Sequence, residues 1–92
     1  MQVKYAKIFD KSVAKIKDKI ALKRLDVLIE KLKKAQSLSE INNVKALTNN
    51  PFLFRIRTGD YRLIVEQTDI NVIEILLIEY LKRDDNTYKE YK

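Results

Sequence analysis

The stretch Phe54–Val65, FRIRTGDYRLIV, decides the fold, because it holds the chain's only glycine between two strand-like runs. Glycine supplies the positive φ that the first central position of a type II′ turn requires, so Gly59-Asp60 predicts a two-residue β-hairpin. Directly opposed residues in that hairpin are then 58 and 61, 57 and 62, 56 and 63, and 54 and 65.

Side chains alternate between the two faces of a strand, so this register assigns every side chain of the hairpin to one face. One face carries the apolar set Phe54, Ile56, Leu63 and Val65. The other carries Arg55, Arg57, Arg62 and Ile64. We expect helices to cover the apolar face. Arg62 should then lie on the solvent side, where its replacement by alanine changes stability by no more than about 0.5 kcal/mol.

The choice of arginine on this face is unusual for the chain. Of fourteen lysines and five arginines, three arginines fall in this one hairpin. Like charges directly opposed across two strands destabilise a sheet, whereas the planar guanidinium binds phosphate in a bidentate manner. The pattern therefore predicts an anion-binding surface. The alternative is an arginine ladder without function, partly neutralised by Glu66 and Glu79.

A second hairpin is expected with its turn at Ile70-Asn71. Val65 would then pair with Leu76, and Arg62 with Glu79. This register places Leu76 and Ile78 in the core. It places on the arginine side Ile75, Leu77, Glu79, Leu81 and Arg83. The apolar members of that set would form a patch that either receives a partner or is covered by the C-terminal segment.

The N-terminal half reads as one strand and two helices. Residues 2–9 alternate as a strand does, and Asp10 is placed to cap a first helix. The apolar stripe changes phase near Asp18, which predicts a break before a second helix. Asp84 or Asp85 is placed to cap a short final helix. We therefore predict a single α+β domain over residues 1–92, with a small antiparallel sheet, an N-terminal helical pair on one face and a short C-terminal helix.

Composition limits the chemistry. The 92 residues include no cysteine and no histidine, which excludes thiol catalysis, disulfides, zinc sites with soft ligands and a histidine general base. We expect no metal and no cofactor. The formal charge of +6 favours an anionic partner such as a nucleic acid. No apolar run approaches the roughly 20 residues that span a bilayer, and the charged N-terminus is not a signal peptide, so we expect a cytoplasmic protein without membrane contact.

Several motifs together resemble the RelE/ParE superfamily of toxins from type II toxin–antitoxin pairs. They are Asn43–Leu47 (NVKAL), Phe54–Ile64 (FRIRTGDYRLI), Lys82-Arg83 and Tyr88. The resemblance implies a sheet with an open basic face. For the RelE branch it implies metal-independent cleavage of mRNA in the ribosomal A site, by attack of the 2′-hydroxyl to leave a 2′,3′-cyclic phosphate. It also implies three partners: a cognate antitoxin, the ribosome with its mRNA, and DNA only through the antitoxin complex.

The resemblance also assigns site residues. The catalytic positions of the family fall on Arg55, Arg57, Arg62, Arg83 and Tyr88. Tyr88 would accept the 2′-proton, and the alternative is that it packs a short helix against the sheet. The residues expected to contact RNA are Lys45, Lys82 and Lys89. Many relatives carry lysine at positions 55 and 57 and histidine at position 82. Because arginine rarely gives up a proton, the arginines here are expected to stabilise charge.

Two other functions fit the same fold. A ParE-like protein inhibits DNA gyrase and cleaves nothing, and a catalytically inactive homologue would act only as an antitoxin-binding module. The combination of Arg83 and Tyr88 favours the nuclease, because RelE-type toxins use a basic cluster with a C-terminal tyrosine.

Overall fold

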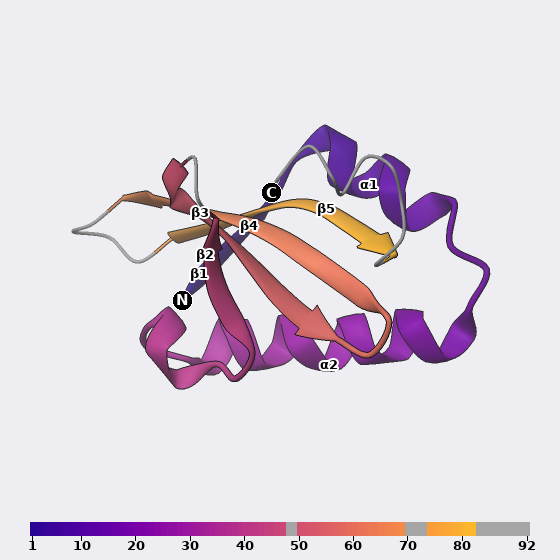
Figure 1. The fold of residues 1–92 in the computed structure, drawn as a ribbon, viewed down its shortest axis with the longest axis horizontal. Coiled ribbons are helices and arrows are strands. Elements are labelled where there is room, and N and C mark those ends of the chain that lie inside the picture. The colour runs from indigo at the N-terminus through magenta and orange to yellow at the C-terminus, as the bar shows by residue number, and fades with distance from the viewer. Residues whose placement is uncertain (48–49, 70–73, 83–92) are drawn as a thin grey trace.

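The computed structural model describes residues 1–47, 50–69 and 74–82. Its elements, in chain order, are β1 (Gln2–Tyr5), α1 (Lys7–Ala14), α2 (Lys19–Lys34), the short 3-10 helix η1 (Leu38–Glu40), β2 (Val44–Leu47), β3 (Asn50–Thr58), β4 (Tyr61–Asp69) and β5 (Glu74–Lys82). Figure 1 shows α2 running along one side of a twisted sheet, with α1 beside β5. The predicted α+β class is therefore confirmed, while the predicted C-terminal helix lies outside the described residues.

The sheet has five strands in the order β1-β5-β4-β3-β2, so the first and last described strands of the chain are neighbours. β1 runs parallel to β5, and the other pairs are antiparallel. The prediction of a purely antiparallel sheet is wrong at this one edge. β2 was not predicted as a strand, because four residues give too short a pattern to show alternation.

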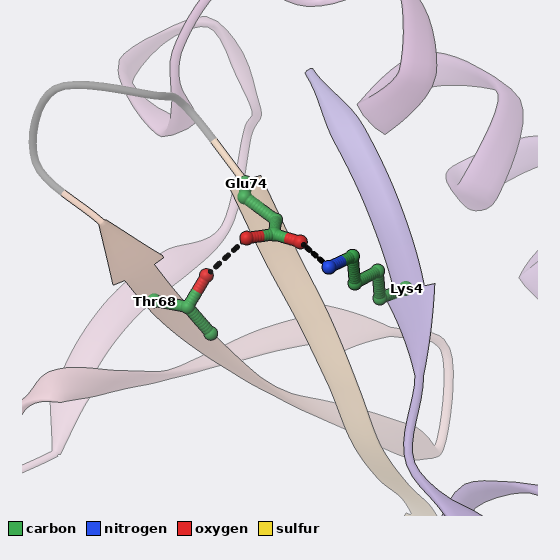
Figure 2. Close-up of polar contacts among 3 residues, drawn as sticks. All are labelled: Lys4, Thr68 and Glu74. Atoms are coloured by element: carbon green, nitrogen blue, oxygen red, sulfur yellow. Dashed lines mark hydrogen bonds and ion pairs between the residues drawn. The ribbon is translucent and has the colours of Figure 1, made fainter.

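Glu74 ties three strands together at the β1 edge, as Figure 2 shows. Lys4 of β1 places its Nζ 2.6 Å from Oε1 of Glu74, and Thr68 of β4 donates a hydrogen bond of 2.9 Å to Oε2. The N-terminal ammonium of Met1 donates to the carbonyl oxygens of Leu32 and Lys33 at the end of α2. A cation is favourable at a helix C-terminus, so these contacts fix β1 between β5 and α2.

The helix break near Asp18 is confirmed. Its carboxylate accepts hydrogen bonds from the backbone N–H groups of Ile20 and Ala21, which makes Asp18 the N-cap of α2. The predicted cap at Asp10 is wrong, because α1 begins earlier, at Lys7, and Asp10 lies in its first turn. β1 ends at Tyr5, and α1 follows it. Phe9 of α1 is buried in the core.

Both helices pack on the same face of the sheet. The core there joins Phe9 of α1 and the buried stripe of α2 to alternate residues of the central strands. The sheet contributes to this core Ile56, Leu63, Val65, Ile75, Leu77 and Tyr80. The first hairpin has the predicted register, with Phe54 opposite Val65 and Arg57 opposite Arg62. Gly59 has φ +62°, while Asp60 is not in the positive-φ region, as a type II′ turn requires.

The predicted register of β4 with β5 is wrong. Val65 pairs with Leu77, and Ile64 pairs with Glu79, so Ile78 is an extra residue in a β-bulge. Ile75 and Leu77 consequently lie in the helix-side core, where we had predicted Leu76 and Ile78. The bulge also lets Tyr80, three residues after Leu77, return to that core. Glu79 and Leu81 do lie on the arginine side, as predicted.

No helix within the described residues is both long and apolar enough to cross a membrane.

Candidate functional site

In the described residues of β2, β3 and β4, four cations lie on the sheet face that is opposite the helices. Lys45 of β2 is directly opposite Arg55 of β3, and Arg57 of β3 is directly opposite Arg62 of β4. Opposed residues share a face, as do residues two apart in a strand, so all four belong to one cluster. We call Lys45, Arg55, Arg57 and Arg62 the basic cluster. Strand spacing places it within a patch of roughly 10 Å by 7 Å.

The members of the basic cluster differ in exposure. Lys45 and Arg57 are exposed, Arg55 is half-buried, and Arg62 is only 5% exposed. The prediction that Arg62 lies open to solvent is therefore wrong. On the same face, β5 places Leu81 directly opposite Arg62. A pattern of alternation assigns a face, but it does not report how deeply that face is covered.

The Arg62 guanidinium is held by the hairpin turn. Its Nη1 donates to the carbonyl oxygen of Tyr61 at 3.0 Å and to that of Gly59 at 3.3 Å. Its buried Nε has no hydrogen-bond partner, and within the described part of the chain Arg62 forms no ion pair. Arginine stays charged at any biological pH, so a buried cation is left with spare donor capacity. An anion is the group that such a donor set is built to receive.

An apolar cluster borders the basic cluster on the same face. Ile64 and Leu81 are buried there, with Leu47, Leu53 and Ile78 packed against them. We had predicted an apolar patch of Ile64, Ile75, Leu77 and Leu81 on the arginine side, which either receives a partner or is covered by the C-terminal segment. The prediction is wrong for Ile75 and Leu77, which face the helices. Ile64 and Leu81 do lie on the arginine side, where both are buried. The β-bulge at Ile78 produces this redistribution.

The described tyrosines do not belong to the basic cluster. Tyr80 is buried, its hydroxyl donates to the carbonyl oxygen of Ala21 at 2.9 Å, and its ring stacks on Tyr61. Burial raises the pKa of Tyr80 to about 12, so it stays protonated at neutral pH. Tyr5 contacts Phe9 at the α1 side. Tyr61 and Tyr80 therefore pack in the helix-side core.

The remaining predicted site residues lie at the end of the chain. Lys82 is the last residue of β5; it is exposed and is opposite Tyr61, on the helix side of the sheet. It therefore does not join the basic cluster. Arg83, Tyr88 and Lys89 lie outside the described residues. Their assignment stays a prediction. We had predicted only that Glu79 partly neutralises the arginines. Its burial on the face of the basic cluster was not predicted, because that burial depends on the β-bulge.

Solved structures share this fold across nearly the whole chain. A chain of the RelB–RelE antitoxin–toxin complex from Methanococcus jannaschii superimposes with a TM-score of 0.77 at 24% identity, covering 97% of this chain and 99% of that chain. The RelE–RelB complex from Pyrococcus horikoshii gives 0.69 at 22% identity, covering 90% and 94%. The isolated RelE toxin from E. coli gives 0.63 at 17% identity, covering 97% and 92%.

No family model matches the chain, and no curated protein matches its sequence. The structural likeness, with each identity below 25%, shows a shared fold. The resemblance drawn from the sequence motifs is thus confirmed at the level of the RelE fold.

Proposed function

We propose that this chain is the toxin of a type II toxin–antitoxin pair and that it cleaves mRNA in the ribosomal A site. The observation that carries the proposal is the basic cluster on the sheet face opposite the helices of a RelE fold. Residues 1–92 would act as one toxin domain in the cytoplasm. Several of the similar structures are complexes of RelE with its antitoxin RelB, which supports a cognate antitoxin as partner.

The proposed chemistry needs concentrated positive charge. Attack of a ribose 2′-hydroxyl on the adjacent phosphate builds negative charge on a pentacoordinate phosphorus. Preorganised cations that lie where this charge develops lower the barrier without a metal. Arg62 fits this role because the hairpin turn already orients its guanidinium. Arg55 and Arg57 flank it on β3 and would bind the phosphates on either side.

Proton transfer is assigned to the end of the chain. Tyr88 would accept the 2′-proton, with its pKa lowered by neighbouring guanidiniums, and Arg83 would join the cluster that stabilises the phosphorane. Lys45 and Lys89 would hold the RNA outside the reacting phosphate, whereas Lys82 lies on the helix side of the sheet and is not assigned this role. Since these contacts are largely electrostatic, binding to free RNA should weaken steeply as salt rises.

The test uses purified protein and ribosomes programmed with a defined mRNA. Cleavage should give a 5′-hydroxyl end that polynucleotide kinase labels without prior phosphatase treatment. A single 2′-deoxynucleotide at the cleaved position should abolish it. Arg57→Ala should slow cleavage, whereas Lys33→Ala, which removes one charge from the far helix, should not. Cleavage that persists at the 2′-deoxy position would refute the mechanism.

The same preparation tests the alternatives. Absence of cleavage together with loss of gyrase supercoiling activity would establish the ParE-like function. Absence of both, with binding to the antitoxin retained, would establish an inactive antitoxin-binding module.

A further inference from the structure

A pocket of about 430 Å³ lies beside the last residues of β5, and the short connection between α1 and α2 forms part of it. Residues 15–18 of that connection make one wall, together with Ser12 of α1. Residues 79–82 of β5 and Tyr61 of β4 make the other wall (Figure 1). A volume of this size accommodates a small ligand. No member of the basic cluster lines the pocket, and the proposed nuclease gives it no role.

The pocket lies where β1 no longer covers the edge of β5. β1 ends at Tyr5, which pairs with Leu77, and beyond that residue no described strand pairs with the outer edge of β5. There the hydroxyl of Ser12 accepts a hydrogen bond of 3.1 Å from the backbone N–H of Tyr80. Outward-pointing backbone groups recur at every second residue of an antiparallel strand, so the N–H of Lys82 points to the same edge. A backbone donor is thus available beside the pocket.

Three lysines surround the pocket, and they come from separate parts of the chain. Lys15 and Lys17 lie on the connection between the helices, and Lys82 is the last residue of β5. All three are exposed, and within the described residues none of them forms an ion pair. Lys82, which the structure separates from the basic cluster, therefore belongs to a second group of cations. Three ammonium groups around one pocket favour an anionic ligand.

Two carboxylates also line the pocket, but both are directed elsewhere. Asp18 accepts hydrogen bonds from the backbone N–H groups of Ile20 and Ala21, as the N-cap of α2. The side chain of Glu79 is buried on the face of the basic cluster, opposite Ile64. The three lysines consequently keep the capacity to bind an anion from outside the chain.

The remaining lining is aromatic and aliphatic. Tyr61 is half-buried, and its ring stacks on that of Tyr80 with centroids 4.9 Å apart and an interplanar angle of 19°. Ile16 and Leu81 complete this part of the wall. Nucleic-acid bases stack on aromatic side chains whatever the base, because every base has a π-face. A flat ring beside Tyr61 and a phosphate among the lysines together describe a nucleotide.

We propose that this pocket binds one nucleotide, with its base against Tyr61 and its phosphate among the three lysines. An inorganic anion would leave the aromatic and aliphatic wall without a contact, and an uncharged nucleoside would leave the lysines without one. The nucleotide is either free or part of an RNA chain, since both present the same base and phosphate. The site does not depend on the proposed nuclease, because it shares no residue with the basic cluster.

The experiment titrates the full-length ¹⁵N-labelled chain separately with adenosine 5′-monophosphate, adenosine, inorganic phosphate and a short oligoadenylate. The monophosphate should shift the amide signals of residues 15–18 and 80–82. It should half-saturate these shifts at a concentration at least about tenfold lower than adenosine or inorganic phosphate requires. Nuclear Overhauser effects between the adenine ring and the Tyr61 side chain should accompany the shifts.

Charge variants supply the matched control. Lys15→Glu/Lys17→Glu should weaken the monophosphate at least about tenfold, since two attractive contacts become repulsive. Lys7→Glu/Lys11→Glu changes the net charge equally on α1 outside the pocket, and affinity should stay within about twofold. Equal weakening by both variants would overturn the proposal. Inorganic phosphate that binds as tightly as the monophosphate, or a lack of shifts at residues 15–18 with both nucleotide probes, would overturn it as well.

The oligoadenylate identifies the source of the nucleotide. Shifts of the same amides by the oligoadenylate, lost in Lys15→Glu/Lys17→Glu, would support the proposal with RNA as the ligand. Shifts by the monophosphate alone would support it with a free nucleotide as the ligand. A wild type that cleaves no mRNA but shows these shifts would refute the nuclease alone, whereas normal cleavage without the shifts would refute the pocket proposal alone.

Discussion

Arg62→Met separates the catalytic role of Arg62 from a structural one. The side chain is 5% exposed, and its charge has two carbonyl acceptors and no carboxylate within the described residues. Hydrogen bonds to a charged group contribute about 1.5–3 kcal/mol, while an unpaired buried ion costs several kcal/mol to desolvate. Repulsion from Arg57, directly opposite, adds to that cost. Methionine keeps the apolar stem and removes the charge.

The opposing contributions nearly cancel, with the desolvation cost the larger. We therefore expect Arg62→Met to leave the free energy of unfolding unchanged or to raise it by up to about 2 kcal/mol. Arg62→Ala also loses the packed stem, so it should be less stable than Arg62→Met by about 1–3 kcal/mol. Arg57→Met removes an exposed cation from the facing strand, and its stability should stay within about 0.5 kcal/mol of the wild type.

Cleavage should respond differently. Loss of one preorganised electrostatic donor costs about 2.7–4 kcal/mol in the transition state, so Arg62→Met should cleave roughly two to three powers of ten more slowly. Urea unfolding and single-turnover cleavage on the same samples give both quantities. Destabilisation of Arg62→Met by more than about 1 kcal/mol would show that the charge itself holds the fold. Undiminished cleavage by a folded Arg62→Met would remove Arg62 from the catalytic mechanism.

Three further predictions concern the fold. Asp18→Ala removes the N-cap of α2 and should lower the free energy of unfolding by about 1 kcal/mol, which corresponds to a fall of about 4–8 °C in Tm. Asp10→Ala removes no cap, so its free energy of unfolding should stay within about 0.5 kcal/mol of the wild type. Equal losses in the two variants would contradict this. Gly59→Ala should lower the free energy of unfolding by about 1–2 kcal/mol, because φ at this position is +62°. Adding Arg24→Ala should not restore the lost stability, since the Arg24 side chain can move away from an added methyl group. Because burial raises the pKa of Tyr80 to about 12, the folded state keeps this proton above pH 10 while the unfolded state loses it. Stability from this group should therefore be constant below pH 10 and fall between pH 10 and pH 12, and Tyr80→Phe should lose that fall in alkaline unfolding curves.

The sequence by itself determined the first hairpin and the helix break. At Gly59 the turn chemistry and the period-two pattern demand the same register, so each restricts the other and no tertiary information is needed. At Asp18 a capping side chain coincides with a change of phase in the apolar stripe. The clustering of Arg55, Arg57 and Arg62 on one face followed from that register, and Lys45 joined them once β2 paired with β3.

Only the tertiary structure decided the features that depend on distant neighbours. β1 pairs in parallel with β5 across some seventy residues of sequence. The sequence of a four-residue strand does not indicate which strand it pairs with. The bulge at Ile78 arises because Leu77 and Tyr80 both enter the core at an odd spacing, which a regular period of two cannot accommodate. The depth of Arg62 and the pocket beside β5 depend on how strands and helices stack, since alternation fixes the face of a side chain but packing fixes its access to water.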